Sequence, residues 1–328
     1  LHPGDEGAQA GAMVAMNAGG VRAVKHGIMR NQVVGIKAVL PTGEIVHYGG
    51  SEGKLKKNNA GYDLMQLLIG SEGTLGVITE VSLKLYPEPN AHGTLIVSFD
   101  KREDAFAAVP AILKRGIIPM ALEYVEKKEI EMAAEDLGKK WPAEKGKYSL
   151  IIMLSEDKED DIFEIGAQID EITSEFNAVD MLIAQSNSER KDILDIRSHI
   201  LPAISDEIVD SPDVTVPRGS LLNYLERLTE IEEKYNTSCP VIAHAGDGNL
   251  HVLILKEDGQ KPDYYEDIKK DIYQSAVETG GTITGEHGIG KLRRDYLPLM
   301  YSERELEIMK KIKEVFDPNN ILNAGKSI

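Results

Sequence analysis

Two histidines that flank a tight turn are the strongest sign of chemistry in this sequence. Residues 244–251 read His-Ala-Gly-Asp-Gly-Asn-Leu-His. Asp-Gly between two β-like runs is a frequent two-residue hairpin turn, and it predicts that His244 pairs directly with His251. Their Cβ atoms would then lie about 5 Å apart on one face of the hairpin. Two imidazoles at that separation can bind one divalent cation, and the alternative is a pair of structural histidines that hydrogen-bond backbone near the turn.

A second segment combines a carboxylate and an imidazole between glycines. Residues 280–291 read Gly-Gly-Thr-Ile-Thr-Gly-Glu-His-Gly-Ile-Gly-Lys. Glycine permits positive φ and close approach of a ligand around Glu286 and His287. On a regular strand adjacent side chains point to opposite faces, so one of the two would complete a His/His/Glu metal site and the other would face another part of the pocket. A solvated Glu-His pair in a loop is the alternative. The spacing does not match a P-loop.

Three weaker features accompany these two segments. Residues 70–79 (Gly-Ser-Glu-Gly-Thr-Leu-Gly-Val-Ile-Thr) form a glycine-spaced turn before a strand, which presents N–H groups to an anion or a flavin edge. Residues 17–20 (Asn-Ala-Gly-Gly) are similarly suggestive. Arg197 lies in a predicted helix, 188–200, and an arginine there can hold a substrate carboxylate bidentately. The alternative for Arg197 is a surface ion pair with Asp195 or Glu189.

The periodicity of apolar residues predicts the elements that position these side chains. Short strands are predicted in the glycine-rich region before residue 92, and strands alternating with amphipathic helices after it, which is typical of α+β layers. The predicted strands are 33–40, 44–48, 77–86, 148–154, 181–185, 240–244 and 250–255. The predicted helices are 104–115, 126–137, 160–177, 188–200, 221–235, 264–279 and 302–315.

Composition excludes several classes of protein. The chain has 328 residues and a formal charge of −17, which argues against nucleic-acid binding because phosphate contacts need a basic surface. No apolar run approaches the ~20 residues that a membrane-spanning helix needs. The single cysteine, Cys239, excludes an internal disulfide and a cysteine-cluster metal site. With nothing that resembles a signal peptide, the expected location is the cytoplasm.

Taken together, the blocks at residues 17–20, 70–79, 244–251, 281–291 and 317–326 resemble, in that order, the FAD-linked D-2-hydroxy-acid dehydrogenases. These are flavoproteins of the vanillyl-alcohol-oxidase type, and they include glycolate oxidase flavoprotein subunits and D-lactate dehydrogenases. The resemblance covers essentially the whole chain. It implies an α+β fold: the second half of the FAD-binding domain at 1–92, a cap (substrate) domain with an antiparallel sheet at 93–308, and a tail at 309–328 that returns to the FAD domain.

The resemblance also implies roles for individual residues. His244, His251 and Glu286 match metal ligands, His287 matches the catalytic base, and Arg197 matches a substrate-carboxylate binder. The residues that match FAD contacts are Asn17, Gly19, Gly20, Ser71, Glu72, Gly73, Thr74, Gly76, Ile78 and Asn323.

The sequence departs from the family pattern at several points. Met16 stands where a threonine is usual, and Ala324 where a proline is usual. Leu253 replaces an asparagine seen in relatives specific for hydroxyglutarate, which favours a smaller substrate. The family's FAD domain begins with a glycine-rich pyrophosphate loop, which this sequence does not contain. We therefore expect the chain as given to hold little FAD and to be inactive alone.

The expected reaction is oxidation of D-lactate or glycolate to the 2-oxo acid by FAD, with zinc, iron or manganese in the substrate site. By resemblance, the electrons would pass to an electron-transferring flavoprotein or an iron–sulfur subunit, in a homo- or hetero-oligomer. Two other functions remain open from the residues alone. One is a metallohydrolase that uses His244, His251 and Glu286 with a metal-bound water. The other is a non-catalytic fragment that docks to a partner.

Overall fold

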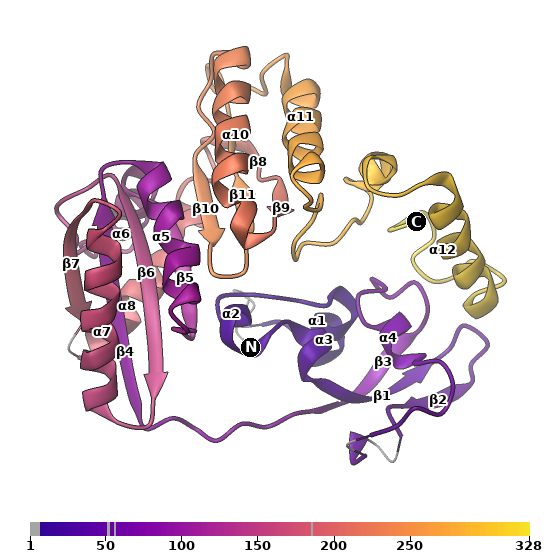
Figure 1. The fold of residues 1–328 in the computed structure, drawn as a ribbon. Coiled ribbons are helices and arrows are strands. Elements are labelled where there is room, and N and C mark those ends of the chain that lie inside the picture. Colours follow the sequence, from indigo (N-terminus) through magenta and orange to yellow (C-terminus); the bar gives the residue numbers. More distant parts are fainter. Residues whose placement is uncertain (1–6, 51–52, 56, 185) are drawn as a thin grey trace. The chain divides into compact units, whose positions relative to one another are not determined.

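The computed structural model describes residues 7–50, 53–55, 57–184 and 186–328 and divides the chain into two compact units (Figure 1). Unit 1 comprises Leu1–Pro87 and Ile283–Ile328, and unit 2 comprises Glu88–Thr282. The sequence placed the domain limits at residues 92 and 308 instead. The positions of the two units relative to each other are not determined. Each unit has its own sheet and its own helices.

Unit 1 is built on a three-stranded antiparallel sheet in the order β2-β1-β3. Its strands are β1 (Val33–Val39), β2 (Ile45–Tyr48) and β3 (Val77–Leu83). Its helices are α1 (Ala10–Met16), α2 (Ala23–His26), α3 (Met29–Gln32), α4 (Met65–Leu68) and α12 (Glu303–Phe316), with a 3₁₀ helix at Arg294–Leu299. The core joins Ile36 and Ala38 of β1 to Val14 of α1 and Leu68 of α4. This packing fixes where the loops before and after α1 and α4 lie.

Unit 2 contains a seven-stranded sheet in the order β7-β4-β6-β5-β10-β11-β9, with every neighbouring pair antiparallel. The strands are β4 (Ala91–Phe99), β5 (Ala121–Glu126), β6 (Tyr148–Glu156), β7 (Ala178–Ala184), β9 (Asp213–Thr215), β10 (Val241–His244) and β11 (Asn249–Val252). Two further strands, β8 (Ile208–Asp210) and β12 (Ile254–Leu255), form a small sheet of their own.

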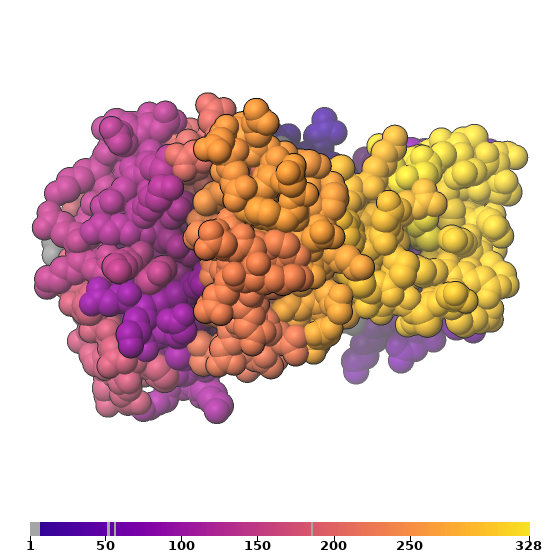
Figure 2. All heavy atoms as spheres, turned by 90° about the horizontal axis from the view of Figure 1, so that it is seen from above, coloured from indigo at the N-terminus to yellow at the C-terminus, as the bar shows by residue number. Residues whose placement is uncertain are grey.

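Helices cover both faces of the large sheet (Figure 1). The helices α6 (Lys127–Asp136), α8 (Asn187–Ser198) and α9 (Ile200–Ala203) share a buried apolar cluster with Ile96, Ile151 and Ile242 of the sheet. On the other face, Phe106 of α5 (Arg102–Lys114) packs against Tyr124, with ring centroids 4.3 Å apart. The helices α7 (Glu159–Ser174), α10 (Leu221–Tyr235) and α11 (Tyr265–Glu278) complete the unit. Figure 2 shows α10 and α11 as adjoining salmon and orange surfaces.

The predicted helices and the predicted strands are present, with ends displaced by a few residues, and the strand predicted at 250–255 is divided into β11 and β12. Three strands of the large sheet, β4, β5 and β9, were not predicted. Neither β4 nor β5 shows a simple alternation of apolar and polar residues in the sequence. The segment at 91–99 directly follows the Pro-rich boundary, and β5 is a short strand with a glutamate among apolar residues. These strands matter, because β5 and β9 carry charged side chains of the site described below. No helix of the described residues is long and apolar enough to cross a membrane.

Glu126 at the end of β5 is a carboxyl group with an unusual protonation equilibrium. It accepts hydrogen bonds from the Val241 N–H (3.0 Å) and the Tyr124 hydroxyl (3.3 Å). Burial nevertheless raises the pKa of Glu126 to about 7, because desolvation of the charged form outweighs these bonds and the nearby Arg102. The folded protein therefore holds a proton on Glu126 between about pH 4.5 and 7, where an unfolded chain does not.

This proton predicts a pH dependence of stability. Unit 2 should lose stability as the pH rises through the window from about 4.5 to 7, by on the order of 3 kcal/mol. Glu126→Gln removes the titration, so its stability relative to wild type should grow from pH 5 to pH 8. Urea unfolding followed by the fluorescence of Trp141, the only tryptophan and a buried residue of unit 2, measures this. The exposed Glu135 provides the control, because Glu135→Gln should follow the wild-type profile; parallel profiles for both variants would contradict the prediction.

Candidate active site

The large sheet gathers five polar side chains on one face. Ala243 pairs with Tyr124, which places the preceding Glu123 beside the following His244 on adjacent strands. His244 in turn pairs with Asn249, and His251 pairs with Asp213. All five are buried, with exposed fractions of 8% or less: Glu123 1%, Asp213 0%, His244 8%, Asn249 5% and His251 4%. Burial of so many polar groups at one place is costly unless they bind one another or a ligand.

The hairpin that carries the two histidines differs from the sequence prediction in its register. His244 pairs with Asn249 and Ile242 pairs with His251, so the direct pairing of His244 with His251 is wrong. A two-residue turn of the expected type needs positive φ at both positions, but only Gly248 has one (+87°), and Asp247 does not. Residues 245–248 therefore form a four-residue turn. At Gly248 a Cβ would lie 2.2 Å from the Val216 carbonyl oxygen, so no other residue fits.

The displaced register still leaves both histidines on the same face. Side chains alternate along a strand with period two, and a shift of two residues keeps each one on its side of the sheet. His244 and His251 are diagonal neighbours, with ring centroids 5.4 Å apart and ring planes at 84°. The prediction that the two imidazoles lie together thus survives with a different pairing.

Glu123 binds two of the predicted site residues at once. Its carboxylate oxygens Oε1 and Oε2 lie 2.9 and 2.8 Å from Nδ1 of His244. The same Oε2 lies 2.7 Å from Nη2 of Arg197, which reaches it from α8. A carboxylate can only accept, so the His244 Nδ1 that faces it carries the hydrogen and Nε2 becomes the nitrogen with the lone pair. Glu123 therefore decides which nitrogen of His244 can bind a metal ion.

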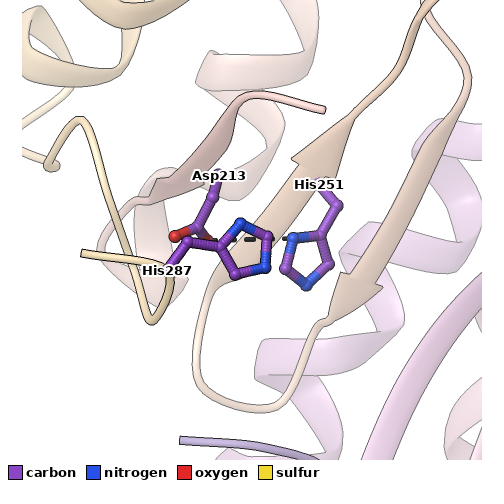
Figure 3. A group of neighbouring side chains, drawn as sticks. All are labelled: Asp213, His251 and His287. Carbon is purple, nitrogen blue, oxygen red and sulfur yellow. Dashed lines mark ion pairs between the residues drawn. The ribbon is translucent and has the colours of Figure 1, made fainter. Parts of the chain in front are cut away.

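Asp213 has the corresponding position beside the second histidine. Its Oδ1 lies 3.8 Å from Nδ1 of His251, and Figure 3 shows the two side chains pointing toward each other from adjacent strands. Asn249 donates from Nδ2 to the same Oδ1 at 2.6 Å and to the Val214 carbonyl at 2.9 Å, which fixes the carboxylate. At 3.8 Å the two atoms are within ion-pair distance but beyond hydrogen-bond distance, so Asp213 lies beside the ring of His251 without the direct bond that Glu123 makes to the other histidine. A carboxylate bonded to a histidine ring, as Glu123 is, is the usual second partner of a metal ligand, because it orients the ring and makes it more basic.

Arg197 does not form the surface ion pair that the sequence left open. Asp195 binds Lys139 at 2.8 Å, and Glu189 accepts from the Ser186 N–H at 2.9 Å in the cap of α8. The Arg197 side chain is only 11% exposed, and its buried Nε has no hydrogen-bond partner among the described residues. A buried guanidinium with a donor that no neighbour uses has the chemistry to bind a carboxylate.

Glu286 and His287 belong to unit 1, in a segment of bends rather than a strand. The sequence prediction assumed that these two residues lie on a strand, which would send their side chains to opposite faces. That assumption is wrong, because the segment is not a strand. Glu286 is half-buried and His287 is exposed. A Cβ at Gly19 would lie only 2.9 Å from Oε2 of Glu286, so a predicted metal ligand and a predicted flavin contact are neighbours in unit 1.

The glycine-rich segments of unit 1 are held together by one carboxylate. Glu72, in a left-handed backbone conformation (φ +52°), accepts from the N–H groups of Ile289 (2.7 Å) and Gly290 (2.8 Å) and from the Ser327 hydroxyl (3.1 Å). The backbone carbonyl of Glu72 accepts from Nδ2 of Asn323 at 2.6 Å. The blocks at 70–79, 281–291 and 317–326, which are far apart in sequence, therefore meet at Glu72.

The remaining predicted flavin contacts surround this junction. Asn17 ends α1 with φ +52° and its Oδ1 accepts from the Arg30 N–H at 2.9 Å. Gly19 and Gly20 are buried, and no hydrogen bond among the described residues engages their N–H groups. Buried donors of this kind suit an acceptor-rich ligand such as a flavin. The other predicted contacts are Ser71, Gly73, Thr74 and Gly76, in or next to the loop that Glu72 anchors, and Ile78 on β3.

Sequence reasoning missed Glu123 and Asp213. The signal for Glu123 was a glutamate alone among apolar residues in 120–125 (Met-Ala-Leu-Glu-Tyr-Val), the pattern of a buried strand with one charged position. Asp213 lies in a stretch without periodicity. Only the pairing of β9 with β11 shows that it reaches His251.

Comparison with known proteins places the chain in a family. A model for the C-terminal domain of FAD-linked oxidases matches residues 88–327, and a model for an FAD-binding domain matches residues 2–49. The chain belongs to the FAD-linked oxidase family. A D-lactate dehydrogenase of Archaeoglobus fulgidus is 37% identical over 327 residues, covering 100% of this chain and 71% of the relative. The glycolate oxidase subunit GlcD of Bacillus subtilis is 35% identical, covering 96% of this chain and 67% of that protein.

Solved structures agree with the fold. A 4-ethylphenol oxidase from Gulosibacter chungangensis matches with a TM-score of 0.64 at 14% identity, over 90% of this chain and 65% of that one. An alkyldihydroxyacetonephosphate synthase matches with a TM-score of 0.62 over 95% of this chain and 56% of its own. The predicted α+β fold of the vanillyl-alcohol-oxidase type and the resemblance to the D-2-hydroxy-acid dehydrogenases are thereby confirmed. This FAD-linked oxidase is accordingly an oxidoreductase, which decides against the metallohydrolase alternative.

The role of Glu72 in joining three segments can be tested by hydrogen exchange. Glu72→Gln replaces a charged acceptor of three hydrogen bonds with an amide that has one oxygen, and bonds to charged groups are the stronger ones. The amides of Ile289 and Gly290 should then exchange about tenfold faster, as measured by mass spectrometry of peptides that contain them. Glu80, an exposed residue of β3 paired with Lys37, supplies the control variant Glu80→Gln. Unchanged exchange at 288–291 in Glu72→Gln would show that these segments are held by other contacts.

Proposed function

We propose that this FAD-linked oxidase oxidises a small D-2-hydroxy acid, D-lactate or glycolate, to the 2-oxo acid, with a divalent metal ion bound by His244, His251 and Glu286. The names of the relatives support the substrate class, since they are a D-lactate dehydrogenase and a glycolate oxidase subunit. The observation that carries the metal is the pair of buried histidines on one sheet face, each beside a buried carboxylate.

Charge balance supports a cation at this place. Glu123 and Asp213 bring two buried carboxylates to the face, and Arg197 supplies one guanidinium. A divalent ion bound by two imidazoles would add positive charge beside these two buried carboxylates, which is favourable where water is excluded. Two histidines and a carboxylate suit zinc, iron(II) or manganese(II).

The residues of the chain then have separate tasks. Arg197 binds the substrate carboxylate through donors such as its buried Nε. His287 accepts the hydroxyl proton, because an imidazole titrates near neutral pH. When bound, FAD supplies the acceptor for the hydride from the substrate Cα, and the metal ion polarises the hydroxyl oxygen. Gly19, Gly20 and the loop anchored by Glu72 provide donors and close approach for the flavin.

Substrate size and electron transfer follow from further features. Leu253, two residues after His251, is fully buried among apolar side chains and offers no partner for a second substrate carboxylate, which supports a small hydroxy acid. The electrons would pass to a separate acceptor, such as an electron-transferring flavoprotein or an iron–sulfur subunit. One relative is itself named as a subunit, and the formal charge of −17 suits a partner with a basic surface.

The metal site predicts a simple result in elemental analysis. The protein should contain about one divalent transition metal ion per chain, and His244→Ala should lose most of it, because one of three ligands is gone. His92, an exposed histidine on β4 of the same sheet, supplies the control, and His92→Ala should keep the wild-type content. Equal metal content in all three proteins would contradict the site.

The substrate assignment predicts that a substitution of Arg197 raises the Michaelis constant for the hydroxy acid. FAD-loaded protein should be bleached by D-lactate or glycolate without oxygen, and Arg197→Lys should raise KM by about 10- to 100-fold, because an ammonium cannot reproduce the guanidinium fork. Arg190→Lys, on the same helix, is the control and should leave KM unchanged. An unchanged KM in Arg197→Lys would remove Arg197 from the site. Failure of both acids to bleach the wild-type flavin would contradict the proposed function itself.

A further inference from the structure

The carboxylate of Glu123 contacts two different side chains, those of His244 and Arg197. One side of its carboxylate faces Nδ1 of His244, and the other contacts the Arg197 guanidinium. The three side chains come from β5, β10 and α8, and the exposed fraction of the Glu123 side chain is 1%. Water therefore cannot substitute for either contact, and the acceptor capacity of this single carboxylate must serve both donors.

The two partners of Glu123 differ in whether they can change from hydrogen-bond donor to acceptor. A guanidinium has only donors, so its neighbour must be an acceptor. An imidazole can present either a donor or an acceptor at Nδ1, and the tautomer follows the neighbour. With a carboxylate at 123, both oxygens lie within 2.9 Å of Nδ1, so the favourable tautomer of the neutral imidazole has the hydrogen on Nδ1 and the lone pair on Nε2.

We propose that Glu123 is a positioning residue that sets the tautomer of His244, and that Arg197 locks this setting by requiring an acceptor at Oε2. This inference rests on the proposed function in one respect, namely that Nε2 of His244 binds the metal ion. The tautomer itself follows from the contacts of Glu123 whether or not a metal is bound. Glu123 thus acts on the metal through His244 and on the substrate through Arg197.

The substitutions Glu123→Gln and Glu123→Leu make this coupling visible because both roughly keep the size of the side chain. In Glu123→Gln, Arg197 holds the amide oxygen at the place of Oε2, which lies 2.8 Å from Nδ1 of His244, so Nδ1–H keeps its acceptor. Glu123→Leu offers no oxygen to Nδ1–H, so the hydrogen of the neutral ring should move to Nε2. The nitrogen needed for the metal ion is then blocked. Glu123→Asp keeps two acceptor oxygens and the charge, so it should keep the tautomer.

The test combines histidine-ring NMR with zinc binding in full-length protein. Two-bond ¹H–¹⁵N spectra of the metal-free protein distinguish the tautomers, and the His244 signal is assigned by its loss in His244→Ala. We expect Nδ1–H in wild type, Glu123→Asp and Glu123→Gln, and Nε2–H in Glu123→Leu. Zn²⁺ affinity, measured by competition with a chromophoric chelator, should fall about 10- to 100-fold in Glu123→Leu and less in Glu123→Gln and Glu123→Asp.

Glu126→Gln provides the matched control. Glu126 lies three residues further along the same strand, which turns its side chain to the opposite face, and it should leave both tautomer and Zn²⁺ affinity at wild-type values. Nδ1–H in Glu123→Leu, Nε2–H in wild type or Glu123→Gln, or an equal loss of affinity in Glu126→Gln would each overturn the inference. If wild type binds no Zn²⁺, the metal proposal fails, while the tautomers of wild type, Glu123→Gln and Glu123→Leu still decide the role of Glu123.

Discussion

The register between β5, β10, β11 and β9 is the constraint on which the candidate site in unit 2 depends. It places Glu123 next to His244, and Asp213 next to His251, on one face of the sheet. A slip of one residue in any of these pairings would send the corresponding side chain to the opposite face, into the apolar layer around Tyr124 and Phe106. The apolar residues that alternate with the polar ones, such as Ala243 and Leu250, therefore hold the chemistry in place by fixing the register.

Carboxylates that are wholly or partly removed from water are the second theme of this structure. The buried Glu123 and Asp213 each lie beside a histidine, and the half-buried Glu72 accepts from two backbone N–H groups and a hydroxyl. In each case a negative charge draws donors or cations from distant parts of the chain to one point. At Glu126, desolvation outweighs the hydrogen bonds from Val241 and Tyr124 and raises the pKa to about 7.

The two units contribute different chemical capacities to an FAD-linked oxidase. Unit 2 supplies imidazoles and a guanidinium on a rigid sheet and the helix packed on it. Such elements hold side chains more accurately than loops. Unit 1 supplies glycine-rich loops with buried N–H donors, as at Gly19 and Gly20, which suit a large planar ligand that must approach the backbone closely. Glu286 lies beside Gly19, so the segment that carries a proposed metal ligand also contacts a loop that we propose to bind FAD.

The sequence by itself determined which residue types carry the chemistry, most of the helices, and the family. These follow from local patterns: glycine spacing, helical periodicity, and two histidines around an Asp-Gly turn. It could not determine the register of that hairpin, because the φ angle of Asp247 and the contact of Gly248 with Val216 are properties of the folded loop. Nor could it show that Glu123 and Asp213 lie beside the histidines, or that Glu72 joins Ile289 to Ser327. Those contacts join residues separated by tens to hundreds of positions. Only the pairing of the strands and the packing of unit 1 bring these residues into contact.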